Sequence, residues 1–111
     1  MREVLYSILL LVFSITNTLH SQCHYLMYMY DSYGDGWNSA YLEVNMNGTF
    51  VGNYDCYQSF TLDSVYSTTG SAVEFIWHSG NWDSEISFTI MDPMGDTLIN
   101  VISASDLDDL D

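Results

Sequence analysis

The chain has 111 residues, with 15 Asp and Glu, a single basic residue in Arg2, three His and a formal net charge of −14. Nucleic acids and anionic membrane surfaces are bound through basic side chains, so this composition makes both poor partners, and we expect no nucleic acid. Cations suit such a chain, although acidity alone also keeps a secreted protein soluble.

Residues 1–22 have the layout of a secretory signal peptide. Arg2 lies in a short charged start, residues 4–15 are almost wholly apolar, and residues 16–22 turn polar. The apolar run is shorter than the roughly 20 residues that a membrane-spanning helix needs, and an uncleaved N-terminal anchor is the alternative. We expect export, cleavage near residue 22 and no membrane insertion afterwards. The mature chain would then contain no Lys or Arg.

Cys23 and Cys56 are the two cysteines of the chain. An even number of cysteines in an exported chain predicts a disulfide, which a small domain often needs. Such a bond would contribute roughly 3–4 kcal/mol in the loop-entropy model. Two buried thiols are the alternative.

Short strand-like runs alternate with turn signals from residue 23 to residue 104. In residues 39–46 the apolar positions alternate with polar ones, and Asn47-Gly48 then marks a hairpin turn. No stretch has sustained helical periodicity, so about seven to eight short strands predict an all-β fold, an antiparallel β-sandwich or a jelly-roll-like variant. We expect strands at 23–30, 39–46, 49–54, 57–63, 71–77, 85–91 and 97–103, and a frayed acidic tail at 105–111.

The loop DSYGDGWN at residues 31–38 concentrates oxygen ligands and glycines. Calcium takes about six to eight oxygens from carboxylates and carbonyls, and a glycine-rich backbone can curl around the ion. Asp31, Asp35 and Gly36 have the D-x-x-x-D-G spacing of oxygen-rich calcium loops. A plain turn built from Asp and Gly is the alternative.

The loop is not an EF-hand. Tyr33 stands where an EF-hand has Asp or Asn, and the twelfth position is Leu42 instead of Glu.

Two runs, DSYGDGWNSAYLEV (31–44) and SGNWDSEISFTIMDPMGDTL (79–98), resemble the GDGWN-type β-sandwich module of secreted and cell-surface proteins, notably of Bacteroidetes, marine microbes and protists. The resemblance covers about residues 23–103. It implies an extracellular module and leaves its activity open. Larger members of this family often carry sorting or catalytic domains, so the chain fits either a stand-alone module or a part of a longer protein.

The resemblance also suggests a metal site shared by two segments. In a sandwich, the loop after the first strand and the start of the strand at 85–91 can lie at one end. Clustered carboxylates repel one another, and a divalent ion removes that repulsion. A solvated carboxylate is the alternative for Glu85. The expected calcium ligands are Asp31, Asp35 and Glu85, with Asn38 and Asp83 as accessories.

Trp37 and Trp82 are the candidate ligand-binding aromatic residues. An exposed aromatic ring beside polar loops can stack on a sugar, and Trp82 is the better candidate for that role. Trp37 follows the glycines of the loop, so packing over the turn is its alternative role. Trp77 lies on the expected core face of its strand.

The expected function is a calcium-stabilised binding or adhesion module, secreted or at the cell surface. Its partner would be an extracellular glycan or surface protein, with carbohydrate as the leading ligand class. A purely structural module is the main alternative, and a small glycoside hydrolase using Asp35 and Glu85 is a remote one. We do not expect the protein to be an enzyme, because the sequence has no recognisable nucleophile, metalloprotease or phosphate-loop motif.

Overall fold

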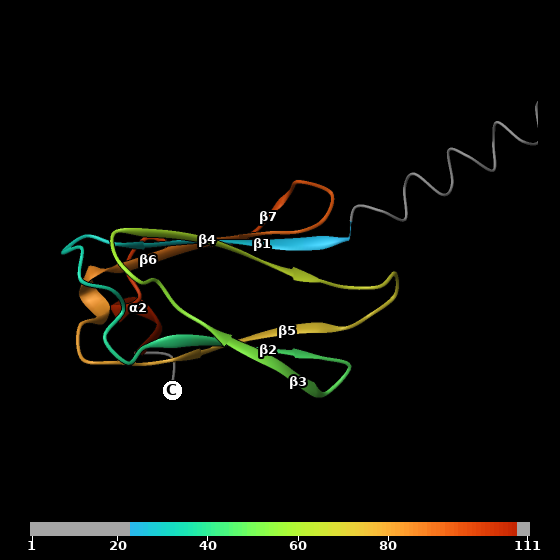
Figure 1. Ribbon diagram of the computed structural model, residues 1–111, viewed down its shortest axis with the longest axis horizontal. Coiled ribbons are helices and arrows are strands. Elements are labelled where there is room, and N and C mark those ends of the chain that lie inside the picture. Colours follow the sequence, from blue (N-terminus) through green and yellow to red (C-terminus); the bar gives the residue numbers. More distant parts are fainter. Residues whose placement is uncertain (1–22, 109–111) are drawn as a thin grey trace, which may run out of the picture.

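Seven strands form two antiparallel sheets that face each other (Figure 1), which confirms the predicted all-β sandwich. The computed structural model describes residues 23–108, so the predicted signal peptide and the end of the acidic tail lie outside the described residues. One sheet has the strand order β4-β1-β6-β7 and the other has the order β3-β2-β5. The strands are β1 (His24–Asp31), β2 (Tyr41–Met46), β3 (Thr49–Tyr54), β4 (Phe60–Tyr66), β5 (Val73–His78), β6 (Ile86–Met91) and β7 (Thr97–Val101).

Alternation of apolar and polar residues places the core between the two sheets. Leu42 and Val44 of β2 are buried, as are every second residue of β6 and Met27 and Met29 of β1. Asn47 and Gly48 both have positive φ, at 53° and 81°, which matches the two-residue turn predicted between β2 and β3.

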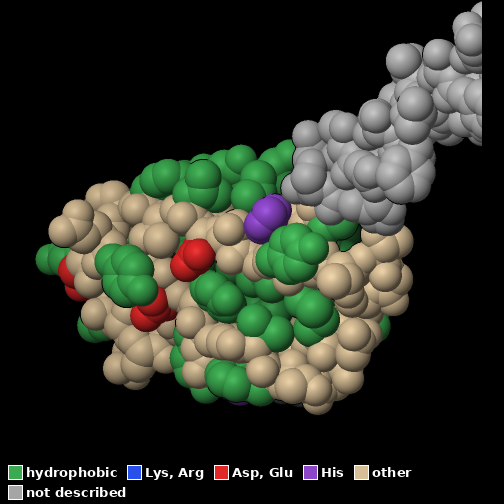
Figure 2. All heavy atoms as spheres, turned by 45° about the vertical axis from the view of Figure 1, so that its right-hand side comes forward, with side chains coloured by type: hydrophobic (Ala, Val, Ile, Leu, Met, Phe, Trp, Pro, Cys, Tyr) green, Lys and Arg blue, Asp and Glu red, His purple; other side chains and the backbone are tan. Residues whose placement is uncertain are grey.

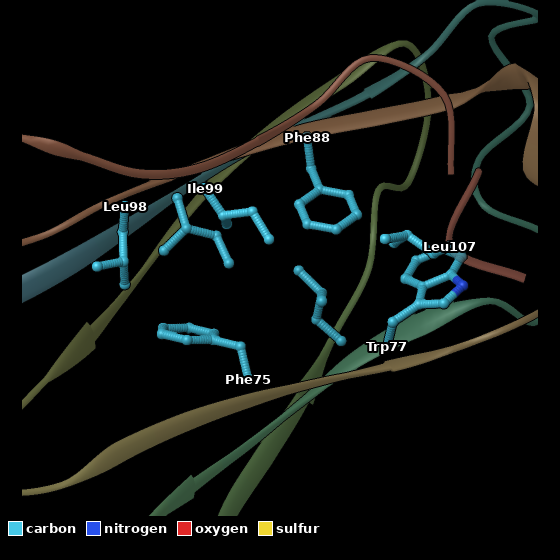
Figure 3. A pocket seen from close by; sticks show the side chains of 8 residues that line it. Phe75, Trp77, Phe88, Leu98, Ile99 and Leu107 are labelled. Carbon is cyan, nitrogen blue, oxygen red and sulfur yellow. The ribbon is translucent and has the colours of Figure 1, made fainter. Parts of the chain in front are cut away.

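An apolar pocket of about 360 Å³ remains between the sheets. Figure 3 shows Phe75 and Trp77 on the lower side of the pocket and Phe88, Leu98 and Ile99 on the facing upper side. Leu107 closes one end of this pocket from the short helix α2 (Ser105–Asp108). Residues 105–108 were expected to be frayed, but the contact of Leu107 with the core holds this helical turn in place.

Strand β4 begins at Phe60, three residues later than predicted. The preceding residues form a loop that supports the end of β1 instead. The carbonyl of Cys56 accepts a hydrogen bond from the Trp37 N–H at 3.1 Å, and the carbonyl of Ser59 accepts one from the Asp31 N–H at 2.9 Å.

The predicted disulfide between Cys23 and Cys56 is wrong, because the two cysteines are not bonded. Cys56 is buried, and its thiol donates to the carbonyls of Met29 and Gln58 at 3.5 and 3.2 Å. Cys23 lies before the first residue of β1, six positions from Met29. At about 3.3 Å per strand residue, the cysteines are about 20 Å apart along β1, far beyond the reach of a disulfide.

Candidate metal centre

Three connections between strands and the helix α2 meet at one end of the sandwich. Asp31 ends β1 and pairs with Ile86, the first residue of β6, and the Ser32 N–H donates to the carbonyl of Glu85 at 3.0 Å. The loop 32–40, the loop 55–59, the segment 79–85 and α2 therefore all lie at this end of the molecule (Figure 1). This confirms that the loop after the first strand and the start of the strand at Ile86 lie side by side.

Asp31 organises the first of these loops. One of its carboxylate oxygens, Oδ2, accepts hydrogen bonds from three successive backbone N–H groups, those of Gly34, Asp35 and Gly36, at 3.0, 2.9 and 2.9 Å. The residue is 3% exposed. Its second oxygen, Oδ1, is buried and has no hydrogen-bond partner among the described residues. Asp31 thus fixes the loop with one oxygen and holds the other unpaired.

The glycines allow this wrapping. Gly34 and Gly36 have φ values of 89° and 91°, in the left-handed region that glycine adopts without strain. A Cβ at position 36 would also lie 3.0 Å from the carbonyl oxygens of Cys56 and Tyr57. The motif therefore needs glycine for both backbone conformation and space.

Asp83 organises the facing segment in a different way. It is 5% exposed, and both of its oxygens have partners: Oδ2 accepts from Ser79 Oγ at 2.6 Å and Oδ1 accepts from the Gly80 N–H at 2.9 Å. Asp83 was predicted as an accessory ligand, but its oxygens are used to close the turn before η1 (Asp83–Glu85).

Gly80 brings the two segments together. A Cβ on Gly80 would lie 2.7 Å from the Ala40 N atom and 2.8 Å from the Asn38 carbonyl oxygen. Such distances are shorter than any side chain tolerates, so only glycine permits this contact. Glu85 follows five residues later and is thereby placed opposite the Asp31 loop.

Asp31, Asp35 and Glu85 each offer a carboxylate oxygen, and these oxygens lie within 4.8 Å of one another. Desolvation raises the pKa of the Glu85 carboxyl above its ordinary value, and the nearby carboxylates of Asp31 and Asp35 raise it further. No Lys or Arg follows Arg2 in the sequence, and Figure 2 shows carboxylates without any Lys or Arg side chain on the face it displays. The three predicted main ligands therefore come together without a compensating positive side chain.

Asn38 lies beside this cluster and contacts it through its amide nitrogen. Nδ2 donates to Asp35 Oδ1 at 3.2 Å and to the Gly36 carbonyl at 3.1 Å. Asn38 was predicted as an oxygen ligand, whereas in the structure it orients the Asp35 carboxylate.

The three tryptophans have separate roles. Trp37 is 1% exposed, packs edge-on against Trp77 and donates from Nε1 to the Tyr30 carbonyl at 3.0 Å. It therefore pins the loop onto the core, and its ring is too buried to be the predicted ligand-binding surface. Trp82 is 55% exposed.

A pocket of about 330 Å³ adjoins the carboxylates. It is lined by Tyr33, Asp35, Trp82 and Glu85. Tyr33, which is 75% exposed, was not among the predicted site residues. The available signal was an aromatic residue at a loop position where calcium loops carry Asp or Asn.

The donor set fits a hard divalent cation. All three groups are carboxylates, which suit calcium or magnesium, and no described His or Cys belongs to the cluster, as a zinc or copper site would require. Of the three, Asp31 lies at the buried side, while Asp35 and Glu85 line the pocket.

The part of the chain that the structure describes has no helix long and apolar enough to cross a membrane. Comparison of the chain with protein families, curated protein sequences and solved structures gives no match. The resemblance to GDGWN-type modules therefore rests on the two sequence motifs.

Proposed function

We propose that the chain is a secreted or cell-surface binding module that holds a calcium ion through Asp31, Asp35 and Glu85 and binds carbohydrate in the adjoining pocket. The observation that carries the proposal is the buried, unpartnered Oδ1 of Asp31, which belongs to a cluster of three carboxylates.

A bound cation explains why the cluster is tolerated. Burying an ionised carboxylate oxygen without a partner costs several kcal/mol, and neighbouring carboxylates add repulsion. In a chain without Lys or Arg beyond Arg2, the compensating charge must come from solution. A proton shared between two carboxylates would relieve the same repulsion, so the test must separate a metal ion from a proton.

Calcium is favoured over magnesium by the shape of the ligand set. The carboxylate oxygens come from the glycine-containing loop and from Glu85, and calcium accepts irregular arrangements of such ligands. Magnesium requires near-ideal octahedral geometry and keeps most of its water. Calcium is also abundant where an exported module would work, and extracellular modules bind it at affinities of about 10⁻⁴ to 10⁻³ M.

The pocket beside the cluster favours a ligand-binding role over a purely structural one. Tyr33 and Trp82 are 75% and 55% exposed, and both line the pocket beside the carboxylates. Exposed aromatic rings next to carboxylates suit sugars, which have apolar faces and hydroxyl edges. In the structural alternative, the ion would only stabilise the loop and these rings would have no ligand.

A thermal melt with calcium, magnesium or EDTA tests the metal site. A ligand at a hundredfold excess over Kd stabilises the folded state by about 2.7 kcal/mol, which raises Tm by on the order of 10 °C in a domain of this size. We expect this rise with calcium at pH 7, a much smaller rise with magnesium, and loss of the calcium effect in the double variant Asp35→Asn, Glu85→Gln.

Glu74→Gln is the matched control. Glu74 is exposed on β5 and lies outside the cluster, so Glu74→Gln removes one negative charge without touching the site. It should retain the full calcium response. An equal response in the double variant, or no rise in Tm for the wild type, would contradict a metal ion at this cluster.

A further inference from the structure

The carboxylates leave part of a calcium ion's coordination sphere unfilled. Asp31 has only Oδ1 to offer, because Oδ2 already accepts three N–H groups. Asp35 Oδ1 accepts from Asn38, which leaves its second oxygen, and Glu85 can give one or two. These side chains supply about four oxygens, whereas calcium takes about six to eight. About two or more coordination positions on the ion are therefore left for other ligands.

The unfilled positions face the pocket. Asp31 is 3% exposed and forms the buried side of the cluster, whereas Asp35 and Glu85 also line the pocket of about 330 Å³. An ion held by all three carboxylates therefore has protein behind it and the pocket in front. Two groups on adjacent atoms of a ligand in that pocket can take two neighbouring positions on the ion.

The pocket walls select the rest of the ligand. Tyr33 and Trp82 contribute exposed aromatic rings from the two segments that also supply Asp35 and Glu85. A sugar ring carries an apolar face for an aromatic wall and vicinal hydroxyls for the ion. A ligand without adjacent hydroxyls would leave the open positions on the ion to water, and a ligand without an apolar face would not stack on the aromatic walls.

Charge selects against acidic sugars. Three carboxylates around one divalent ion still carry a net negative charge, and the chain has no Lys or Arg beyond Arg2 to offset it. A uronic acid, sialic acid or sulfated sugar would bring another negative charge into this field. A neutral sugar brings none.

We infer that the calcium ion is itself part of the ligand site: a neutral glycan binds by placing two vicinal hydroxyls on the ion, with its ring against Trp82 or Tyr33. This inference rests on the proposed function and narrows it, since the ion would then contact the ligand as well as stabilise the loop.

Terbium luminescence tests this contact directly. Tb³⁺ replaces calcium at oxygen sites, is excited through nearby Trp and Tyr, and its lifetimes in H₂O and D₂O count the waters on the ion. The chain without its predicted signal peptide, residues 23–111, is first screened with calcium on an array of neutral and acidic oligosaccharides, and the strongest neutral binder is added to the Tb³⁺-loaded protein. We expect loss of about two bound waters as two hydroxyls replace them.

Three variants complete the experiment. Trp82→Ala and Tyr33→Ala should each weaken array binding, by about tenfold for Trp82, while the calcium-induced rise in Tm persists. Tyr57→Ala is the control, because Tyr57 is 73% exposed and lies outside this pocket. It should bind the array as the wild type does.

The outcomes separate the inference from the proposed function. Terbium binding with no loss of water on glycan addition, or array binding that persists in EDTA, would overturn the contact between sugar and ion and leave the metal site standing. Terbium binding with no neutral glycan bound would also overturn it and favour a structural ion. Failure of both calcium and terbium to bind would remove the proposed metal site itself.

Discussion

Asp31 and Asp83 are two buried aspartates at the same end of the sandwich, and they differ in one respect. Both are at most 5% exposed, and both accept hydrogen bonds from backbone N–H groups of their own loops. Asp83 has a partner for each oxygen, whereas Asp31 has three partners on Oδ2 and none among the described residues on Oδ1.

The comparison teaches that burial of a carboxylate does not by itself indicate a binding site. A loop can bury an aspartate simply to close a turn, and Asp83 fits that description completely. The oxygen that the fold leaves unsatisfied is the informative one, because buried polar atoms are almost always paired. Asp31 closes its loop with Oδ2 and leaves Oδ1 without a hydrogen-bond partner among the described residues.

The largest expected effect is that of Asp31→Ala. It leaves three N–H groups of the loop without their acceptor, and the one on Gly36 is buried. We expect the free energy of unfolding in EDTA to fall by about 3 kcal/mol, measured by urea denaturation. The rise in Tm with calcium should also be lost.

Asp31→Asn separates the role of Asp31 in closing the loop from its role as a calcium ligand. Its amide oxygen can still accept from the loop N–H groups, so stability in EDTA should stay within about 1 kcal/mol of the wild type. Its missing charge should still abolish the calcium response. If Asp31→Asn kept that response, Oδ1 would not be a ligand and the contrast with Asp83 would have no functional meaning.

Asp83 provides the opposite result. Asp83→Ala should lower the free energy of unfolding in EDTA by about 2 kcal/mol, because two hydrogen bonds to a buried carboxylate are lost. Asp83→Asn can still accept from Gly80 and should retain the full calcium response. A calcium response that depended on the charge of Asp83 would place this residue in the site after all.

A smaller effect is expected at Gly80, where the two loops touch. In Gly80→Ala the new Cβ would meet the Ala40 N atom at 2.7 Å, so the segment 79–85 must move away from the Asp31 loop. We expect a loss of about 1–2 kcal/mol in the free energy of unfolding, typical of overpacking. Calcium affinity, measured by titration calorimetry, should also weaken as Glu85 shifts.

Gly52→Ala is the control for this substitution. Gly52 also lacks a positive φ, and a Cβ there would lie 3.4 Å from the side chain of Tyr54, which is ordinary contact. It should leave calcium affinity unchanged. Equal affinity in Gly80→Ala would mean that the packing of the two loops does not position Glu85.

The strands were predictable from local pattern because each buries one face. Alternation in residues 39–46 and 85–91 and the Asn47-Gly48 turn located the two sheets' central elements. Strand β4 was misplaced by three residues because Cys56 and Ser59 bond across the molecule to Trp37 and Asp31, a partnership that no local signal reveals.

The predictions of a frayed tail and of a disulfide were wrong for a related reason. A four-residue helix has no local stability, so only the contact of Leu107 with the core could reveal it. The count of cysteines predicted a bond, but bonding depends on distance, and β1 separates Cys23 from Cys56.

For the site, loop spacing pointed to Asp31 and Asp35, and the sandwich arrangement suggested by the family resemblance added Glu85; the structure brings the three carboxylates together. The sequence did not show which carboxylate oxygens would accept hydrogen bonds from their own loop, so Asp83 was also predicted as a ligand. The pattern Ser79-Gly80-x-x-Asp83 held that information, since an aspartate can accept from groups three and four residues before it. No comparable local pattern shows that Asp31 Oδ1 is left without a hydrogen-bond partner among the described residues, so only the structure reveals it.

The smallest expected effect is the pH dependence, and it tests the cluster without any substitution in the Asp31 loop. The pKa of Glu85 is raised above its ordinary value of 4.5, chiefly by desolvation and then by the Asp31 and Asp35 carboxylates. In EDTA the folded state therefore binds the Glu85 proton more tightly than the unfolded chain does. Ionised Glu85 disfavours folding above the raised pKa, and this penalty disappears as the pH falls through the raised pKa toward the ordinary value.

Calcium reverses the sign, because it binds only the ionised carboxylates and competes with the proton. The stabilisation by calcium should therefore shrink over the same pH window, and melting curves recorded with calcium and with EDTA should converge as the pH falls. Glu85→Gln should remove the contribution of this group in both solutions. Glu43 supplies an internal contrast of opposite sign, because hydrogen bonds from Asn45 and His78 lower its pKa. Its stabilisation is present above the ordinary pKa and is lost as the pH falls through the lowered value, and it should persist in Glu85→Gln. Curves that stayed parallel with and without calcium would mean that the ion does not bind at Glu85.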